Sequence, residues 1–330
     1  MVKPSPSQSN DPLSGYFGHL TREQQKALDE LKTLLVNDGI QLGESLVDES
    51  YGNRQHGVSD LELLRFLRAR KFDIHKAYDM YKAALSWRHS VDLDNLYATF
   101  DWPTARRASR AGYLQYFHKH DKSHSPIHIH ELHTLNLNKL FQIISPEDQV
   151  RYMFLLNESN FRERFPGCTK EMRRNKQGDE IRKTREEKTE REEVADDTLG
   201  EIETVTGILD IKNVGLMGFW KVKDMLGRVI HISDNYYPET SNRMASVTSV
   251  FKKTRPHASL LQFIINAPAM FSTVWAYVRP WLDARTASRR YSAQTTNRPY
   301  WNTSQRRICL YFMGEAVHAK TLREVAGAGT

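Results

Sequence analysis

The stretch FIINAPAMFSTVWAYVRPWLD, from Phe263 to Asp283, constrains the fold more than any other part of the chain. Its first residues, Phe263 to Ile265, predict a short buried strand, and Pro268 fits the first turn of a following helix. The helix expected from Ala269 to Pro280 is apolar on nearly every side, with large side chains at Met270, Phe271, Val274, Trp275, Tyr277 and Val278. Such a helix is either buried all round in a protein core or faces an apolar partner that is not always protein.

Composition and charge narrow the class of protein. With 330 residues, of which 39% are hydrophobic, the chain is long enough for one large or two smaller domains with a real core. No apolar run approaches the roughly 18 residues of a membrane span, and the N-terminus has no apolar signal core, so we expect a cytoplasmic protein. Cys168 and Cys309 stand far apart without metal-ligand spacing and are expected to be reduced thiols.

The net charge of +7 favours an anionic partner, but membranes, nucleic acids and acidic proteins all satisfy that description. The chain has no zinc-finger spacing, no RNA-recognition signature and no glycine-rich phosphate loop. It also has no GxSxG nucleophile elbow and no HExxH helix. We therefore expect a protein that is not an enzyme and does not bind nucleic acid.

Helix-start signals organise the first quarter of the chain. Residues 1–18, rich in Pro, Ser, Gly and Asn, are expected to form a disordered leader. Capping patterns then predict three helices that begin after Thr21, Ser59 and Asp73, the first two with Gln or Glu three residues later. These signals predict a helical unit at residues 19–92.

From Tyr113 onward the pattern is typical of an α/β fold. YLQYF and PIHIHEL alternate as half-buried strands do. A helix expected at about 146–165 precedes an apolar strand at 205–211, and a helix at about 218–237 precedes the strand that begins at Phe263. Strands separated by helices favour right-handed βαβ crossovers and a mainly parallel sheet.

Three stretches depart from this pattern. Residues 171–198 are mostly charged and predict a solvated helix or a disordered loop. Residues 240–262, rich in basic and hydroxyl side chains, are unusually long for a loop inside a compact domain. The tail, residues 291–330, contains no pattern that continues the sheet.

Four motifs point to a known family: LLRFLRARKFD at 63–73, Trp87-Arg88, NYYPE at 235–239 and FIINAP at 263–268. On these motifs the chain resembles the CRAL-TRIO family from about residue 20 to 290, and most nearly the fungal phosphatidylinositol/phosphatidylcholine transfer proteins of the secretory pathway. The resemblance implies an N-terminal helical lobe at 19–92 and an α/β lipid-binding domain with a mainly parallel sheet at 93–290.

The family implies that this sheet is the floor of an apolar pocket for the acyl chains of one phospholipid, and that the helix after FIINAP serves as a gate. Because burial of each CH₂ is worth about 0.8 kcal/mol, two acyl chains need a long apolar shelter. The gate and pocket residues so implied are Phe263, Ile265, Met270, Phe271, Val274, Trp275 and Val278. The implied ligand is phosphatidylinositol, together with a second lipid of unknown identity, and no cofactor or metal is implied.

The resemblance also implies a headgroup site, whose matching positions are Arg70, Lys71, Glu239, Asp283, Thr286 and Arg289. The helical spacing itself places Arg68, Arg70 and Lys71 on one helix, projecting away from an apolar face. A solvated basic face is the alternative interpretation of these three residues. A guanidinium suits a phosphate, and a carboxylate accepts hydrogen bonds from inositol hydroxyls. Arg289 stands where the family has Lys, which keeps the charge and changes its geometry.

The chain departs from the family where its phosphatidylcholine-binding members carry hydroxyl groups. Val205 and Gly207 replace a Ser-x-Thr pair, and Phe117 and His128 replace two tyrosines. We therefore expect phosphatidylcholine binding to be impaired and phosphatidylinositol binding and transfer to be retained.

Three alternatives stay open. In the first, the chain is a carrier of another hydrophobic ligand such as a sterol, which fits the lost hydroxyl groups. In the second, the six histidines from His118 to His133 form the zinc site of a metal-dependent enzyme, although no Cys or carboxylate pattern completes such a site. In the third, the stretches 171–198, 240–262 and 291–330 come from an unspliced intron or a shifted reading frame, which would give a defective family member, or from a lineage-specific elaboration.

The leading hypothesis is a monomer that loads phosphatidylinositol and presents it at membranes or to lipid kinases. Its basic surface favours transient contact with anionic lipid, and we expect peripheral association with Golgi or endosomal membranes.

Overall fold

The computed structural model describes residues 13–43, 58–121, 124–186, 201–240, 244–246, 262–266, 268 and 270–281. The chain divides into two compact units. Unit 1 takes the segments Met1–Ala98, Ser159–Glu203 and Asn235–Glu239, and unit 2 takes the rest. Asp283, Thr286, Arg289, Cys309 and the tail 291–330 lie outside the described residues, so the predictions made for them stay predictions.

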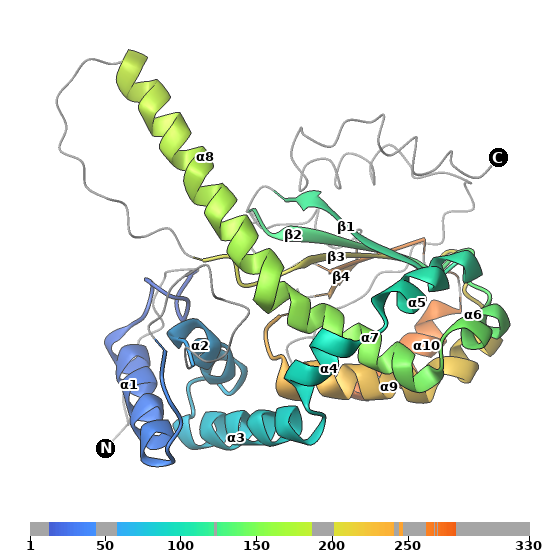
Figure 1. Cartoon of the computed structure of the whole chain (residues 1–330), viewed down its shortest axis with the longest axis horizontal. Helices are drawn as coiled ribbons and strands as arrows, with labels where there is room; N and C mark the ends of the chain where they lie inside the picture. The colour runs from blue at the N-terminus through green and yellow to red at the C-terminus, as the bar shows by residue number, and fades with distance from the viewer. Residues whose placement is uncertain are drawn as a thin grey trace. The chain divides into compact units, whose positions relative to one another are not determined.

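The described part of unit 1 is helical (Figure 1). Its helices are α1 (Arg22–Asn37), α2 (Asp60–Ala69), α3 (Ile74–Ser90), α4 (Leu93–Thr99) and α8 (Phe165–Glu186), the last preceded by a π-helical turn, η3 (Asn160–Arg164). The predicted capping box is confirmed: the Thr21 hydroxyl accepts from the Gln24 N–H at 3.2 Å, and the Gln24 side chain accepts from the Thr21 N–H at 2.9 Å. Ser59 and Asp73 cap α2 and α3 as expected.

The core of unit 1 is built by leucines spaced three and four apart on α1 and α2, which pack on α3. Tyr81 of α3 is fully buried there and meets the Phe66 ring edge-on at 5.0 Å. Phe17 and Leu20 pack against the same core. Residues 13–18, which belong to the predicted disordered leader, therefore form turns that pack on the helices, because Phe17 within this segment and Leu20 just after it contact the core.

The charged stretch predicted at 171–198 is helical up to Glu186, where the description stops. The helix expected to end at Phe165 does not end there. It passes from α7 (Pro146–Ser159) through the π-helical turn into α8. A π turn shifts the hydrogen-bond spacing by one residue, and Pro166, which has no N–H to donate, follows it directly.

The described residues of unit 2 form a five-stranded sheet in the order β1-β2-β3-β5-β4. The strands are β1 (Leu114–His120), β2 (Pro126–Glu131), β3 (Thr206–Asp210), β4 (Met244–Ser246) and β5 (Gln262–Ile265). Only the β1–β2 pair is antiparallel, so the predicted mainly parallel sheet is confirmed. Strand β4 lies in the stretch predicted as a loop at 240–262. Three residues are too few to show a period-2 pattern, and pairing with β5 creates this strand.

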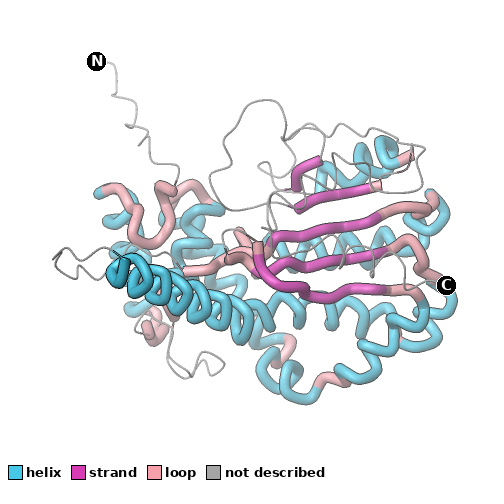
Figure 2. The backbone as a smooth tube through the Cα atoms, turned by 90° about the horizontal axis from the view of Figure 1, so that it is seen from above, coloured by secondary structure: helices cyan, strands magenta, loops and turns pink. Residues whose placement is uncertain are grey.

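The helices of unit 2 are α5 (Trp102–Arg107), η2 (Ala108–Ala111), α6 (Leu137–Ile143), α7, α9 (Leu216–Tyr236), α10 (Phe271–Val278) and η5 (Arg279–Trp281). Helices α7, α9 and α10 lie on the same side of the sheet, as Figure 1 shows, and Figure 2 views the strands with these helices behind them. A second core, which includes Tyr113, Leu140 and Tyr152, joins α5, α6 and α7 to the start of β1.

Gly112 determines the direction in which the chain enters the sheet. It ends η2 with a left-handed backbone, φ 79°. A Cβ at this position would lie 2.1 Å from the backbone oxygen of Thr134. Both the backbone angle and the close approach therefore require glycine at this position.

Candidate functional site

The basic residues Arg70 and Lys71 lie in a turn that closes α2. The helix ends at Ala69, Arg70 is its C-cap, and Lys71 has a left-handed backbone with φ 54°. The Phe72 N–H donates to Leu67 O at 2.7 Å and the Lys71 N–H donates to Arg68 O at 3.1 Å, which is a Schellman motif. The prediction that Arg68, Arg70 and Lys71 all lie on one helix is therefore wrong for the last two, because the turn redirects their side chains.

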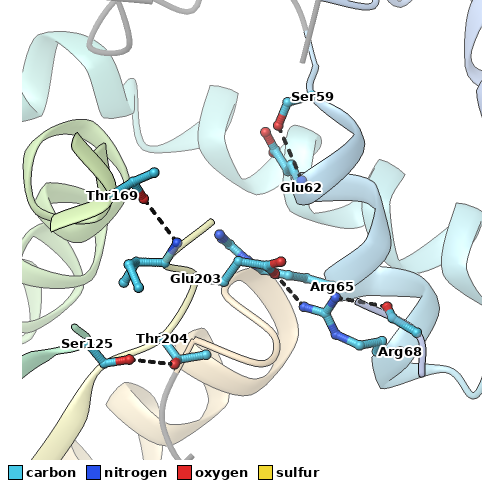
Figure 3. A network of polar contacts seen from close by, with 10 residues as sticks. Ser59, Glu62, Arg65, Arg68, Ser125, Thr169, Glu203 and Thr204 are labelled. Carbon is cyan, nitrogen blue, oxygen red and sulfur yellow. Dashed lines mark hydrogen bonds and ion pairs between the residues drawn. The ribbon is translucent and has the colours of Figure 1, made fainter. Parts of the chain in front are cut away.

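The expectation that Arg68 projects away from the apolar face of α2 is also wrong, and so is the alternative of a solvated position for it. Arg68 and Arg65 are 4% and 3% exposed, and both face the carboxylate of Glu203, which is 5% exposed (Figure 3). One guanidinium nitrogen of Arg68 lies 2.6 Å from Glu203 Oε2, and Arg65 Nε lies 3.6 Å from the same oxygen. Buried charges persist only with such partners, so unit 1 has a charged network at its interior rather than a solvated basic face.

Aromatic rings complete this charged network. The guanidinium of Arg65 lies 4.1 Å from the centre of the Phe161 ring, and that of Arg68 lies 4.2 Å from the Tyr16 ring. Arg68 also donates to the backbone oxygen of Gly15 at 3.2 Å. Cation–π contacts of this kind gain strength when water is excluded.

Helix α8 holds Glu203 in place. The Ile202 N–H donates to the Thr169 hydroxyl at 3.0 Å (Figure 3), and Glu201 pairs with Arg173 at 3.4 Å. The segment before β3 is thus fixed to α8 at Glu201 and Ile202, and the carboxylate of the next residue, Glu203, faces the two arginines.

Glu239, a predicted headgroup residue, acts electrostatically on the same network. Burial works against the charged form of Arg68, but the carboxylates of Glu203 and Glu239, with Tyr16, raise the pKa of this arginine above its usual value. Glu239 is half-buried and has a left-handed backbone, φ 57°. Left-handed non-glycine residues are uncommon and cluster at functional sites, and two of the predicted site residues, Lys71 and Glu239, are of this kind.

Two of the sequence motifs pack against each other and position Glu239. Trp87 of α3 stacks on Tyr236 at 4.5 Å and meets Tyr237 edge-on at 5.9 Å. Tyr237 also stacks on Phe161 at 5.9 Å. The NYYPE segment is therefore held by aromatic contacts to the helices of unit 1.

In unit 2, the sheet places three of the substituted positions in one row. Phe117 of β1 pairs with His128 of β2, which pairs with Gly207 of β3. The rings of Phe117 and His128 stack at 4.6 Å. The structure thus brings together residues that the sequence alone placed about 90 positions apart, and none of the three carries a hydroxyl group.

The candidate gate is helix α10, which begins at Phe271 with Met270 as its N-cap. The expectation that Pro268 lies in the first turn is wrong by a few residues: Pro268 precedes the helix, and its carbonyl accepts from the Phe271 N–H at 2.8 Å. Val278 is buried, whereas Met270, Phe271, Val274 and Trp275 are half-buried. Phe263 and Ile265 belong to β5, but their side chains lie outside the described set.

Aromatic side chains attach α10 to α9. Tyr277 meets Trp220 edge-on at 5.1 Å and Phe219 at 5.8 Å. At the entrance to α10, Asn266 donates to the Asp210 carboxylate at 3.0 Å, which joins the ends of β5 and β3. Tyr277 therefore attaches the C-terminal part of α10 to α9, while the helix presents half-buried apolar side chains at Phe271, Val274 and Trp275.

The histidines do not assemble into a metal site within the described residues. His128 and His130 lie with ring centres 6.1 Å apart, and no three His, Cys, Asp or Glu side chains in the described part of the chain converge to hold a metal ion. Cys168 forms no disulfide within the part of the chain that the structure describes. None of the helices described here is long and apolar enough to span a bilayer.

Comparison with known families decides between the fold-level alternatives. The model of the CRAL/TRIO N-terminal domain matches residues 27–83, and the model of the CRAL/TRIO domain matches residues 110–251. The chain belongs to the CRAL-TRIO family. The matched ranges include α2 with its closing turn, the Phe117–His128–Gly207 row and Glu239.

Curated CRAL-TRIO relatives are similar over most of this chain. The SEC14 cytosolic factor of Yarrowia lipolytica is 29% identical over 277 residues, which are 84% of this chain and 44% of that protein. The Sec14 cytosolic factor of Schizosaccharomyces pombe is 28% identical over 280 residues, covering 85% and 77%. The phosphatidylinositol/phosphatidylcholine transfer protein SFH7 of Arabidopsis thaliana is 29% identical over 228 residues, covering 69% and 34%. The chain thus spans less than half the length of the first and third of these relatives.

The crystal structure of Sfh5 has the same fold. It matches with a TM-score of 0.51 at 16% identity, over 81% of this chain and 79% of that one. At this identity the likeness establishes the CRAL-TRIO fold alone.

Sequence reasoning missed the Arg65, Arg68 and Glu203 network of this CRAL-TRIO chain. A signal was present: Leu61, Leu64, Arg65 and Arg68 follow the i, i+3, i+4, i+7 spacing of one buried helix face. Arginine in such a stripe predicts a buried partner, but the partner lies 135 residues away from Arg68.

Proposed function

We propose that the protein binds phosphatidylinositol and moves it between membranes or presents it there, without changing a covalent bond. The observation that supports this proposal most is the position of Arg70 and Lys71 in the turn closing α2. This turn directly follows the buried Arg68, whose pKa the Glu239 carboxylate helps to raise. Membership of the CRAL-TRIO family and relatives named as phosphatidylinositol/phosphatidylcholine transfer proteins support this function.

In this proposal the headgroup is held by the predicted set: Arg70 and Lys71 bind phosphate, and Glu239 accepts from inositol hydroxyls, with Asp283, Thr286 and Arg289 completing the site. Arg70 is half-buried and Lys71 is exposed. Glu203 supports the site indirectly, because its ion pairs with Arg65 and Arg68 stabilise the end of α2 from which the two basic residues project.

The proposal includes weak binding of phosphatidylcholine. Phe117, His128 and Gly207 supply none of the hydroxyl groups that choline-lipid binding members of the family carry at matching positions. Wild-type protein that transfers phosphatidylcholine and phosphatidylinositol equally well would contradict this part.

The headgroup assignment is tested with purified full-length protein and donor and acceptor vesicles. Arg70→Ala, Glu239→Gln and Arg289→Ala are each expected to reduce phosphatidylinositol transfer roughly tenfold or more, because each removes a charge-assisted contact of about 1.5–3 kcal/mol. Arg110→Ala, at an exposed arginine of η2, is the matched control and keeps full transfer. Unchanged transfer in Arg70→Ala, with an unchanged circular dichroism spectrum, refutes the assignment.

Membrane contact is proposed at the start of α9. Leu216, Met217, Trp220 and Tyr277 are 37%, 74%, 42% and 40% exposed, and Trp220 touches Tyr277, so the apolar side chains form a patch. Exposed Lys212 and Lys221 border the patch in sequence. Apolar and aromatic side chains next to lysines suit the interface of an anionic bilayer.

We expect Met217→Ala with Trp220→Ala to weaken sedimentation with phosphatidylserine-containing vesicles roughly tenfold, since two apolar side chains no longer enter the bilayer. Val36→Ala removes an equally exposed apolar side chain from α1 and is expected to have no effect. Equal sedimentation of both variants would place membrane contact elsewhere.

The same proposal includes three further points. The protein acts as a monomer, it works at Golgi or endosomal membranes, and it presents phosphatidylinositol to lipid kinases.

A further inference from the structure

Two neutral polar side chains lie opposite each other on neighbouring strands of the sheet. Gln115 of β1 and His130 of β2 are directly opposite in the strand register. Both amide atoms of Gln115 and Nε2 of His130 are buried, and no residue in the described part of the chain forms a hydrogen bond with them. Buried polar atoms in native proteins nearly always have a hydrogen-bond partner. These three atoms therefore need a partner other than the described residues.

The pair faces the helices of unit 2. The His130 ring contacts Tyr113 edge-on at 5.0 Å, and Tyr113 packs in the core shared with α5, α6 and α7. Successive side chains of a strand alternate in direction, so Gln115 and His130 share the sheet face of Tyr113, Phe117 and His128. This is the face that α7, α9 and α10 cover in Figure 1.

The surroundings of the pair are aromatic, apolar and uncharged. The stacked Phe117 and His128 rings lie one step along the strands, and Leu209 of β3 pairs with His130. Burial, reinforced by the neighbouring His128, lowers the pKa of His130 to about 3, so its imidazole is neutral at physiological pH. Glu131, the carboxylate next in sequence, points to the opposite face of the sheet and binds the Tyr116 hydroxyl at 2.8 Å.

The chemistry of this row excludes an anionic group and favours a neutral one. A glutamine amide offers two donors and an acceptor, and a neutral imidazole offers one of each. No cation of the row would balance a phosphate, whereas a hydroxyl group is both donor and acceptor and suits the pair. The aromatic rings suit the apolar body that carries the hydroxyl.

We propose that Gln115 and His130 bind the hydroxyl group of an uncharged lipid, such as a sterol or a diacylglycerol, as the second ligand of this protein. The inference rests on the proposed lipid-transfer function and extends it, because it assigns a ligand class to the row that lacks the choline-lipid hydroxyls. Gln115 and His130 are then specificity-determining residues.

The first test uses wild-type protein and pairs of lipids in which one member has a free hydroxyl group and the other lacks it. Extraction of cholestanol is compared with cholestane, and of dioleoylglycerol with its 3-acetyl ester, from phosphatidylcholine vesicles. We expect the hydroxyl form to be favoured roughly tenfold in at least one pair, and the preferred pair tells sterol from diacylglycerol. No preference in either pair, or stronger extraction of phosphatidylcholine than of both hydroxyl lipids, overturns the inference.

The second test uses Gln115→Leu combined with His130→Phe, which keeps the side-chain volumes and removes the hydrogen-bonding atoms. The variant is expected to lose the hydroxyl preference and to keep phosphatidylinositol transfer, with a lipid-free melting temperature at or above that of the wild type. Tyr116→Phe, which removes a hydroxyl group on the opposite sheet face, keeps the preference. A purely structural pair predicts a lower melting temperature and an unchanged preference, which would refute the inference.

The outcomes separate this inference from the proposed function. Phosphatidylinositol transfer without hydroxyl-lipid preference overturns only the inference. Hydroxyl-lipid preference without phosphatidylinositol transfer overturns only the proposed headgroup function. If the wild type shows neither phosphatidylinositol transfer nor hydroxyl-lipid preference, the inference and the proposed function are both overturned.

Discussion

Buried polar groups occur in two regions of this molecule and differ in the contacts that surround them. In unit 1, Arg65 and Arg68 face Glu203 at ion-pair distances and lie over aromatic rings. In unit 2, Gln115 and His130 are half-buried opposite each other, and both amide atoms of Gln115 and Nε2 of His130 are buried with no hydrogen-bond partner among the described residues. In the first region a shared carboxylate balances the buried charges, whereas the second offers neutral donors and acceptors to the ligand proposed above. Burial alone therefore does not distinguish a structural group from a binding group; the charge and the protein contacts of each group have to be compared as well.

The largest expected effect tests the structural side of this comparison. Glu203→Gln leaves two buried guanidinium groups without their shared carboxylate and is expected to lower the free energy of unfolding by about 3–5 kcal/mol. Urea unfolding followed by circular dichroism measures the loss. Asp38→Asn, which breaks the exposed pair between Asp38 and Lys82, is the matched control and is expected to cost far less. Equal losses in the two variants would show that the buried network is not structural.

The next effect tests the burial of His130 through the pH dependence of the free energy of unfolding. Because burial lowers the pKa of His130 to about 3, the unfolded chain binds a proton below about pH 6.5 that the folded chain does not. The stability contributed by neutral His130 is therefore lost as pH falls, by about 2 kcal/mol between pH 7 and pH 5. His130→Phe should remove this part of the pH dependence in urea unfolding. Identical slopes for variant and wild type would mean that His130 is solvated.

The smallest effect separates stability from binding within unit 1. Lys71 has a left-handed backbone that glycine adopts freely, so Lys71→Gly is expected to raise stability by about 0.5–1 kcal/mol. The same change removes a proposed phosphate ligand and should reduce phosphatidylinositol transfer. Lys76→Gly, within α3, should instead lose stability and keep transfer. A Lys71→Gly protein that is both more stable and fully active would remove Lys71 from the headgroup site.

Local patterns predicted the elements of this fold well. The caps at Thr21, Ser59 and Asp73 and the apolar run that became β3 depend on neighbours a few residues away. Features that depend on distant residues were not predicted. Strand β4 is created by pairing with β5, and the π-helical turn extends a helix beyond its expected end.

The candidate site shows the same limit. The resemblance proposed Arg70, Lys71 and Glu239 as headgroup residues, which stays a prediction, and the helical spacing placed the basic residues on a helix that in fact ends at Ala69. Arg65 and Arg68 were missed as buried residues because their partner is contributed by the segment before β3, far along the chain. The pairing of Gln115 with His130 likewise depends on strand register, which neither side chain reveals by itself.

Gly112 has a practical consequence for the genetics of this protein. The oxygen of Thr134 occupies the space that any side chain at residue 112 would need, and the backbone angle there disfavours every other amino acid. In a saturation library screened for lipid exchange, glycine is expected to be the one residue that position 112 accepts. It therefore supplies an internal standard for loss of folding, against which losses at Arg70 or Gln115 can be scored as losses of recognition.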